Sequence, residues 1–405
     1  MRAERLAGWG DNPRYLQTDP RSALSKLTHY PPFRLVGAGC AGYHFTPPRL
    51  MTPPSHYFAC ILAGGSGERF WPMSRVRTPK HLLKLLSERT LLEETAHRLE
   101  GVVPPENIFV LTNEAQLDGI RDALPEVPPD QIVAEPARRD TAPAAALATA
   151  LVRARDPMGV VAILAADAFI RDQQRFTVQL GAAFAWADQN PSLVTFAVTP
   201  SHPSTGFGYL ELGAALGAAG PGGQFRRVKR FVEKPDAATA QGYLKDGAFA
   251  WNAGMFVWQA AVFLREAELH EPLLAAFIRE FPAGDSAAFL AARFPLLPKI
   301  SVDYAIMEKA ANVATLVADF DWDDVGLWTA LPKHLATDAD GNSVRGQVMV
   351  TGASGNIAVS NGRVIALCGV KDLVVVETPD AVLVCHRDAV QDIKKLHPLL
   401  PKEVL

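Results

Sequence analysis

The sequence predicts an α/β fold: a doubly wound, mostly parallel sheet followed by a small C-terminal all-β, β-helix-like domain. From Tyr57 to Val198, short apolar runs alternate with longer segments of helical period, which is the pattern of βαβ units. From about Ser343, short apolar runs follow one another between Gly, Asn and Asp turns, which is typical of a β domain. We therefore expect two folded domains, at 56–335 and 340–405.

Each expected strand is a short apolar run bounded by turn residues, which suits strands buried in a covered sheet. These runs lie at 57–63, 107–111, 131–134, 160–164, 193–198, 209–212 and 226–233, and in the second domain at 348–350, 357–359, 364–367, 373–376 and 382–384. The helices repeat apolar residues every three or four positions, as Leu91, Leu92 and Leu99 do. They are expected at 90–99, 114–124, 142–153, 176–186, 261–270 and 303–311.

Residues 1–55 differ from the rest of the chain. They are rich in proline and show no sustained helical or strand period, so we expect a poorly ordered extension. Met51 stands just ahead of the first expected strand, and one hypothesis is that translation begins there. Mass spectrometry of the native protein tests this, because an amino terminus near Met1 would contradict it.

Charge and hydropathy disfavour several classes of function. The chain has 40 basic and 43 acidic side chains, so no basic excess favours nucleic acid. No apolar run approaches the roughly 20 residues of a membrane span, and no apolar segment follows the basic start as in a secretory signal. The four cysteines lack metal-ligand spacing, which disfavours zinc and favours reduced thiols in a cytoplasmic protein.

The strongest local signal is a glycine-rich loop that directly follows the first expected strand. It runs Ala63, Gly64, Gly65, Ser66, Gly67. Consecutive glycines allow several backbone N–H groups to converge on one anion. The loop is not a P-loop, because no Gly-Lys-Ser/Thr follows, and Phe70 stands where a dinucleotide fingerprint needs its third glycine. Alone, the loop is equally compatible with a simple turn.

The residues after the loop favour a phosphate site. Residues 64–80 read GGSGERFWPMSRVRTPK and contain the unbroken pattern GGxGxRxxPxSRxxxPK. This run resembles the signature of the nucleoside-diphosphate-sugar pyrophosphorylases, in the form seen in mannose-1-phosphate guanylyltransferases. The resemblance continues over nearly all of 57–340 through EPARRDTAP (135–143), AADAFI (165–170), TGFGY (205–209), FVEKP (231–235), WNAGMF (251–256), SVDYAIMEK (301–309) and WDDVGLW (322–328).

The resemblance implies a Rossmann-like nucleotidyltransferase that uses GTP, mannose 1-phosphate and Mg²⁺ to make GDP-mannose and pyrophosphate. Such a transfer needs positioning and cations rather than a protein nucleophile. By resemblance, Arg69 holds the triphosphate, Lys80 lies near the α-phosphate, and Asp167 and Asp324 bind Mg²⁺. Nucleotide contacts are implied for Ala63, Gly64, Gly65, Ser66, Gly67, Glu135, Arg139, Thr141 and Ala142. Sugar-phosphate contacts are implied for Gly206, Gly208, Glu233, Lys234 and Asn252.

Several positions leave alternatives open. Glu135 could accept hydrogen bonds from guanine or act as a carboxylate at a helix start. Asp140 replaces the asparagine that is usual in the family and could cap the following helix. Ala168 replaces a histidine next to Asp167, and Asp323 beside Asp324 could be a simple turn residue.

Two rival functions remain. One is a pyrophosphorylase for another pair, such as dTTP or ATP with glucose 1-phosphate. The other is a non-catalytic sugar-nucleotide sensor, which typically loses the loop arginine or lysine, whereas Arg69 and Lys80 are both present. The C-terminal domain resembles the short β domain of compact relatives, which helps to pair subunits, so a homodimer is expected. No fused second enzyme domain and no nucleic-acid or membrane partner are expected.

Overall fold

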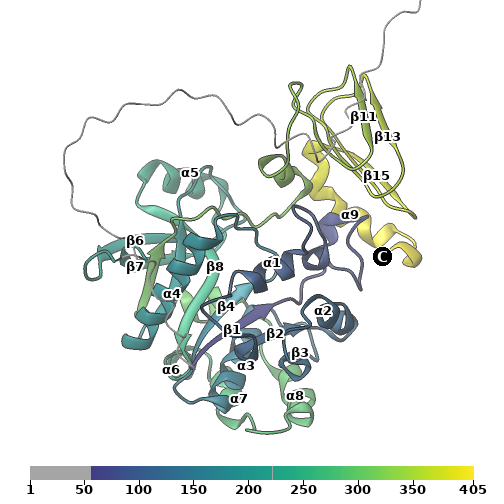
Figure 1. Ribbon diagram of the computed structural model, residues 1–405. Coiled ribbons are helices and arrows are strands. Elements are labelled where there is room, and N and C mark those ends of the chain that lie inside the picture. The colour runs from purple at the N-terminus through teal and green to yellow at the C-terminus, as the bar shows by residue number, and fades with distance from the viewer. Residues whose placement is uncertain (1–55, 221) are drawn as a thin grey trace, which may run out of the picture. The chain divides into compact units, whose positions relative to one another are not determined.

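A nine-stranded sheet is the centre of the computed structural model, which describes residues 56–220 and 222–405 (Figure 1). Its strands along the chain are β1 (Tyr57–Leu62), β2 (Ile108–Thr112), β3 (Ile132–Ala134), β4 (Val160–Ala165), β5 (Leu193–Val198), β6 (Tyr209–Ala215), β7 (Phe225–Val232), β8 (Phe249–Gln259) and β9 (Val313–Val317). Their order is β3-β2-β1-β4-β8-β5-β9-β7-β6, and within this sheet only β7 and β8 run against the others. The predicted doubly wound, mostly parallel sheet is confirmed. The expectation for residues 1–55 falls outside the described residues.

Helices cover both faces of this sheet. They are α1 (Leu91–His97), α2 (Leu117–Ala123), α3 (Thr141–Arg155), α4 (Gln173–Gln189), α5 (Ala237–Asp246), α6 (Ala260–His270), α7 (Pro272–Glu280) and α8 (Ala287–Arg293). Alternate side chains of β1 enter different cores. Phe58 and Cys60 belong to the core with α3, α6 and α7, whereas Ala59 and Ile61 belong to the core with α1, α2 and α4. This two-sided burial explains why β1 is apolar throughout.

Some elements were missed by the sequence prediction. These are β8, β9, α5, α7 and α8 and, in the C-terminal domain, the strand Ser343–Arg345 and the short helix Ile393–Leu396. Strand β8 carries the polar Asn252 and a left-handed glycine, Gly254, at φ 65°, so its sequence lacks a clean strand period. The helix expected at 303–311 is a π-helix, Asp303–Met307, which is shorter and more widely wound than the prediction.

Six further strands form the C-terminal domain (Figure 1). They are β10 (Ser343–Arg345), β11 (Val348–Thr351), β12 (Ile357–Ser360), β13 (Ile365–Cys368), β14 (Leu373–Glu377) and β15 (Val382–His386). Strands β10, β12 and β14 stack in parallel in one sheet, and β11 pairs in parallel with β13 in a second. Strand β15 closes the first sheet by antiparallel pairing with β14. Stacked parallel strands in two sheets confirm the β-helix-like prediction.

Two buried asparagines hold successive turns of this stack together. The backbone N–H of Asn356 donates to Oδ1 of Asn342 at 3.0 Å, and its Nδ2 donates to the same oxygen at 2.8 Å. Asn356 Oδ1 accepts from the Leu373 N–H at 2.9 Å, and its Nδ2 also donates to the Val370 carbonyl at 3.2 Å. One side chain therefore satisfies polar groups of both neighbouring turns, which could not reach water.

Replacing Asn356 by alanine should lower the free energy of unfolding by about 2–4 kcal/mol, because several buried polar groups lose their partner at once. Urea denaturation of the full chain measures this loss. Asn361→Ala is the matched control, since Asn361 is exposed and its side chain makes no hydrogen bond within the described residues. Equal stabilities of the two variants would contradict the structural role of Asn356.

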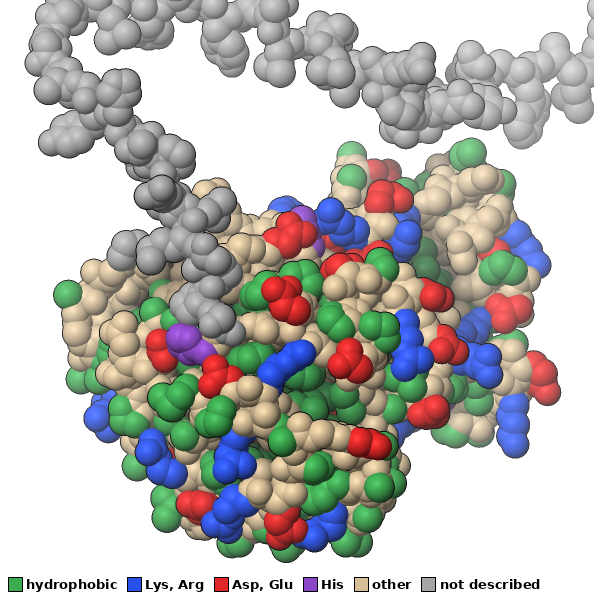
Figure 2. Space-filling model, turned by 60° about the horizontal axis from the view of Figure 1, so that its bottom comes forward, with side chains coloured by type: hydrophobic (Ala, Val, Ile, Leu, Met, Phe, Trp, Pro, Cys, Tyr) green, Lys and Arg blue, Asp and Glu red, His purple; other side chains and the backbone are tan. Residues whose placement is uncertain are grey.

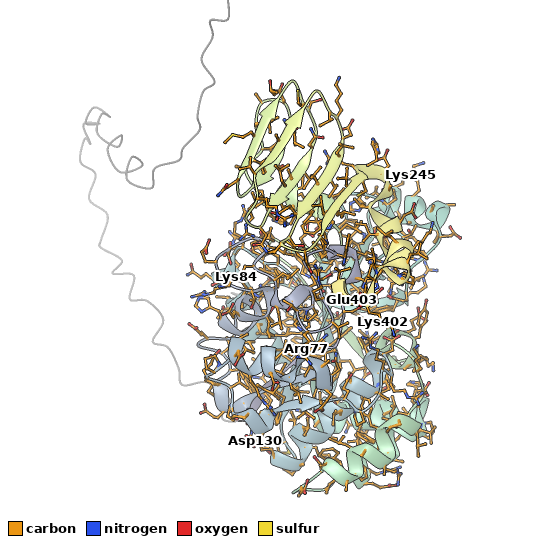
Figure 3. All side chains as sticks on the ribbon, turned by 90° about the vertical axis from the view of Figure 1, so that its right-hand side faces the viewer. Arg77, Lys84, Asp130, Lys245, Lys402 and Glu403 are labelled. Atoms are coloured by element: carbon orange, nitrogen blue, oxygen red, sulfur yellow. The ribbon has the colours of Figure 1, made fainter. Side chains whose placement is uncertain are left out.

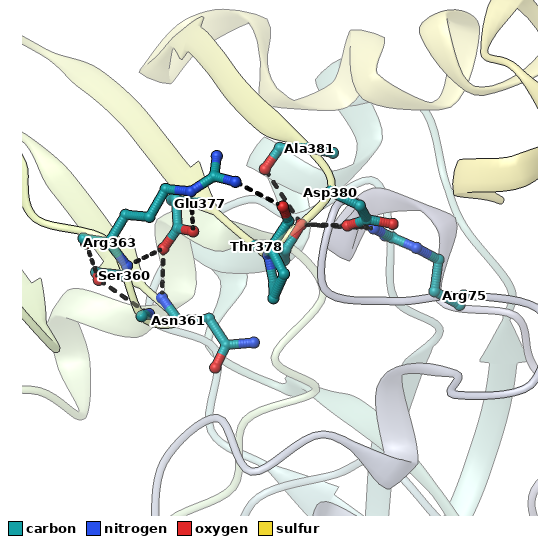
Figure 4. A network of polar contacts seen from close by, with 10 residues as sticks. Arg75, Ser360, Asn361, Arg363, Glu377, Thr378, Asp380 and Ala381 are labelled. Atoms are coloured by element: carbon teal, nitrogen blue, oxygen red, sulfur yellow. Dashed lines mark hydrogen bonds and ion pairs between the residues drawn. The ribbon is translucent and has the colours of Figure 1, made fainter.

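The C-terminal domain packs directly on the segment that follows the glycine loop. Trp71 Nε1 donates to the Val404 carbonyl at 2.8 Å. Arg75 forms an ion pair with Asp380 at 2.8 Å, and Thr378 Oγ1 donates to the same carboxylate at 2.8 Å (Figure 4). Figure 3 shows Lys402 and Glu403, next to Val404, where this domain meets the larger one.

A single apolar cluster, here called the shared core, spans the two parts of the chain. Its buried members are Phe70, Trp71, Leu83, Leu85, Leu91, Val325, Trp328, Leu331, Ile357, Val359, Val374, Val376, Leu383, Val390 and Ile393. The loop that carries Arg69 is thus fixed by side chains from the end of the chain. The space-filling view shows basic and acidic side chains interspersed on the face drawn (Figure 2). Among the described helices, none has the length and apolar character needed to cross a membrane.

Candidate active site

Three adjoining cavities lie near the carboxyl ends of the parallel strands. The central cavity, of about 470 Å³, is lined by Ser66, Gly67, Glu68, Arg69, Phe70, Lys80, Asp167, Asp324, Gly326 and Lys394. On one side the Glu135 cavity, of about 480 Å³, shares Ser66 with it. On the other side the Lys234 cavity, of about 710 Å³, shares Arg69, Asp324 and Gly326 with it. Parallel strands place their following loops at one edge of a sheet, which is where open α/β folds bind ligands.

Lys80 occupies the centre of the arrangement and is only 5% exposed. Its Nζ donates to Asp167 Oδ2 at 2.8 Å and to the backbone carbonyl of Asp324 at 2.6 Å. The structure therefore brings together three residues that are far apart in the sequence. Gly67 allows this packing, because a Cβ there would lie 2.3 Å from Lys80 Cβ and its φ is 64°.

The carboxyl groups of Asp167 and Asp324, near Lys80, have pKa values that shift in opposite directions. Burial tends to raise the pKa of Asp167, but Lys80 and His81 outweigh it and hold that pKa below its ordinary value. Burial raises the pKa of Asp324, with Asp323 and Asp167 adding to the rise and Lys80 opposing it. Asp167 and Asp323 both raise the pKa of Asp324, so negative charge is concentrated at this point.

The carboxylates of Asp167 and Asp324 fit a hard divalent cation. Mg²⁺ is usually bound by one or two carboxylates together with water and substrate phosphates. No cluster of three or more His, Cys, Asp or Glu side chains suited to a metal occurs among residues 56–220 and 222–405. Asp323 is used differently: its Oδ1 accepts from the Val325 N–H at 2.7 Å, and its Oδ2 lies 3.3 Å from both Lys333 and His334. Asp323 therefore stabilises the turn, as one of the two interpretations of the sequence predicts.

The Glu135 cavity has partly apolar walls, and the carboxyl group of Glu135 is half-buried in it. Burial raises the pKa of Glu135 to about 7. Glu135 directly follows β3, and its N–H donates to the Thr112 carbonyl at 2.8 Å. Because α3 starts only at Thr141, the helix-start alternative for Glu135 is wrong. Asp140 is the N-cap of α3, where its Oδ1 accepts from the Thr141 N–H at 2.8 Å.

The remaining predicted nucleotide residues divide into lining and supporting positions. Gly64, Gly65, Arg139 and Thr141 line the Glu135 cavity. Arg139 also donates to the Pro295 carbonyl, and Thr141 Oγ1 accepts from the Val302 N–H at 2.9 Å. Ala63 and Ala142 are buried outside all three cavities. Their backbones brace the site, since Ala63 N–H donates to Leu111 and Ala142 N–H to Ile300.

The predicted sugar-phosphate residues converge next to the Lys234 cavity, which Gly206 and Lys234 line. Lys234 forms an ion pair with Glu233. Burial tends to lower the pKa of Lys234, but Glu233 and Asp303 raise it above its ordinary value. A Cβ at Gly208 would lie 2.5 Å from Glu233 Oε2, so a side chain there would displace this carboxylate from its present position.

Asn252 connects this group to a residue that sequence reasoning did not assign. Its Nδ2 donates to Asp303 Oδ1 at 3.1 Å, and its Oδ1 accepts from Thr195 Oγ1 at 2.7 Å. Asp303 lines the Glu135 cavity, and burial together with Glu233 raises its pKa to about 7. The only signal for Asp303 in the sequence was its place in SVDYAIMEK.

Backbone conformation singles out the same region. Non-glycine residues with left-handed φ are Asp140 at 69°, Lys234 at 46°, Val325 at 44° and Asp372 at 54° among the described residues. The first three flank or form the cavities, and Val325 is β-branched, for which this conformation is unfavourable. Strained backbone of this kind concentrates at functional sites.

The backbone at Ala168, next to Asp167, is held by a hydrogen bond from a buried arginine. The Ala168 carbonyl accepts from Nη2 of the buried Arg98 at 3.0 Å, and the same nitrogen contacts Thr95 Oγ1 at 2.7 Å. The segment after β4 that carries Asp167 is therefore anchored by the guanidinium group of Arg98, which directly follows α1. Burial lowers the pKa of Arg98 to about 10, so it stays charged near neutral pH.

A glycine loop, fixed cations and two carboxylates at the carboxyl edge of a doubly wound sheet are the groups that nucleotidyl transfer needs. A family model described as "Nucleotidyl transferase" matches residues 58–341, and one described as "MannoseP isomerase/GMP-like beta-helix domain" matches 346–398. The chain belongs to the nucleotidyl transferase family and carries the β-helix domain characteristic of that second model.

Known proteins similar to the chain include two curated bacterial relatives and a solved structure. The xanthan biosynthesis protein XanB of Xanthomonas campestris pv. campestris is 38% identical over 83% of this chain and 71% of its own length. The mannose-1-phosphate guanylyltransferase of Escherichia coli is 37% identical over 84% and 73%. A Thermus thermophilus crystal structure, titled a mannose-1-phosphate geranyltransferase, superposes with a TM-score of 0.77 at 32% identity, covering 85% of this chain and 99% of that one.

Proposed function

We propose that the protein transfers a guanylyl group from GTP to mannose 1-phosphate and releases GDP-mannose and pyrophosphate. The observation that carries the proposal is Lys80, held at 2.8 Å from Asp167 and 2.6 Å from the Asp324 carbonyl between two further cavities. One cavity suits a base and the other a phosphorylated sugar, so the α-phosphorus would lie beside Lys80. The similarity to proteins named mannose-1-phosphate guanylyltransferase supports the choice of substrates.

In this proposal the phosphate groups are bound by backbone and cations. The backbone of Gly64 to Gly67 binds phosphate oxygens, and Arg69, which makes no ion pair within the described residues, holds the triphosphate. Lys80 neutralises charge that grows around the α-phosphorus as the sugar-phosphate oxygen attacks. Asp167 and Asp324 would hold Mg²⁺, which when bound neutralises phosphate charge.

The side cavities supply recognition. Glu135 accepts hydrogen bonds from guanine, with Arg139 and Thr141 on the same wall. Lys234 binds the phosphate of the sugar as a point charge. Glu233 and Asn252 bind sugar hydroxyls, and the backbone of Gly206 and Gly208 completes the wall. Asp303, joined to Asn252, sits between the two recognition groups.

The proposed role of Glu135 has a pH signature. With a pKa of about 7, its carboxyl is protonated in mildly acidic solution and carries a donor that faces the N–H donors of guanine. Above that pH both oxygens accept, so guanosine should bind about three- to tenfold more tightly at pH 8 than at pH 6. Tryptophan fluorescence titration with guanosine measures this, since guanosine has no phosphate to titrate. The variant Glu135→Gln should lose the part of this pH dependence that comes from Glu135 and keep only what Asp303 in the same cavity contributes. An unchanged profile in the variant would contradict the proposed role of Glu135 in guanine binding.

Two further assignments are part of the proposal. The β-helix domain pairs subunits in a homodimer, which light scattering of the full chain tests directly. A cytoplasmic location is supported by free thiols, because Cys60, Cys368 and Cys385 form no disulfide within the described part of the chain.

The test of the proposed function is pyrophosphate release with Mg²⁺, for four nucleoside triphosphates against the 1-phosphates of mannose, glucose and N-acetylglucosamine. Release only with GTP and mannose 1-phosphate is the expected result. Activity with another pair would keep the reaction and replace the substrates. No release from folded protein with any pair would favour a sugar-nucleotide sensor.

A further inference from the structure

The central cavity contains a cation from the far end of the chain. Lys394 lines it together with Arg69, Lys80, Asp167 and Asp324. It lies on the short helix α9 (Ile393–Leu396), beyond the last strand of the C-terminal domain. The larger domain therefore does not build the wall of this cavity alone.

Lys394 is held at this place by its neighbours. Ile393 is 3% exposed and belongs to the shared core with Phe70 and Trp71, the residues that directly follow Arg69. Farther along the tail, Val404 accepts the hydrogen bond from Trp71. The tail is thus fixed to the glycine-loop segment on both sides of Lys394, so the backbone that carries this exposed side chain is held beside the cavity.

Lys394 has no anionic partner among the described residues. In residues 56–220 and 222–405 neither Lys394 nor Arg69 makes an ion pair or a side-chain hydrogen bond, whereas Lys80 is already bound to Asp167. The adjacent Lys395 is different, because its Nζ lies 2.7 Å from Asp392. Two unpartnered cations on one cavity wall leave a site for an anion with more than one charged group.

We propose that Lys394 binds the β- and γ-phosphates of the nucleotide, and hence the pyrophosphate that leaves. The inference rests on the proposed function and extends it, because it assigns part of the nucleotide site to the C-terminal domain. Lys394 shares the central cavity with the Arg69 loop but does not line the Lys234 cavity, where the same tail contributes Gln391 instead. Its charge therefore acts on the triphosphate end rather than on the sugar phosphate.

Binding of inorganic pyrophosphate with Mg²⁺, measured by calorimetry on the full chain, tests this role. Lys394→Ala should raise the Kd by about tenfold, as expected for one charge-assisted contact to phosphate. Lys394→Arg should restore most of the affinity, and Lys395→Ala, the matched control, should bind like the original protein. A Kd in Lys394→Ala equal to that of Lys395→Ala would overturn the proposal.

Kinetics separates binding from a structural effect. In Lys394→Ala the KM for the nucleotide should rise about tenfold while kcat changes less than about threefold, because the contact is present before and during transfer. A fall in kcat without a change in KM would overturn the proposal. The calorimetric test does not depend on guanine or mannose, since every triphosphate releases pyrophosphate. The two proposals can therefore fail separately.

Discussion

Lys80→Met should lower kcat by about 10²- to 10³-fold, the size expected for loss of one preorganised charge at a reacting phosphate. Methionine keeps the length of the buried stem but removes the ammonium that contacts Asp167 and the Asp324 carbonyl. Two neighbouring carboxylates would then face the α-phosphorus without their cation. The KM for GTP should change much less, because Arg69 and the glycine loop remain. Steady-state pyrophosphate release measures both quantities.

Lys84→Met is the control for this experiment. Lys84 follows on the same segment but is exposed and lines none of the three cavities, so its loss should leave kcat within about twofold. A loss in kcat/KM with unchanged kcat in Lys80→Met would contradict a role in the chemical step.

Asp324→Asn should lower activity by about 10²-fold or more and shift the Mg²⁺ dependence to higher concentration, because one of two oxygen ligands loses its charge. The fold should survive, because the Asp324 carboxylate accepts a hydrogen bond from the Gly326 backbone, and asparagine keeps an oxygen that can accept it. Activity measured as a function of Mg²⁺, together with the Tm of the same sample, checks both expectations.

The neighbouring Asp323→Asn should give the opposite pattern, mainly a lower Tm. Asp323 supports the turn through Val325, Lys333 and His334. Burial tends to raise its pKa, but His334 and other partners hold that pKa below its ordinary value. If Asp324→Asn kept the original Mg²⁺ dependence, the assignment of Asp324 as a ligand would be wrong.

The sequence allowed the fold class and most of the site to be predicted because the relevant residues lie in contiguous motifs. Lys80 and Gly67 could be named from one run of residues, although their contact could not. Asp303 and Lys394 were not assigned, since each gains its surroundings from strands and helices distant in the sequence. Strand β8 was missed for a related reason: its polar and glycine positions reflect the site that it builds rather than the sheet.

Alternatives about single residues also needed the structure. Asp140 and Glu135 both precede α3, but only Asp140 is close enough to cap it. Local pattern could not decide this, because the intervening residues are in neither helix nor strand.

The shared core also bears on how the protein unfolds and how it can be altered. The described residues, 56–220 and 222–405, belong to one unit of contacts, although the sequence changes character near residue 340. Thermal unfolding should therefore be a single cooperative transition. Removal of the C-terminal tail should not leave a stably folded larger domain. The tail cannot be exchanged between relatives as an independent module unless Ile393, Val390 and their partners Phe70 and Trp71 are exchanged with it.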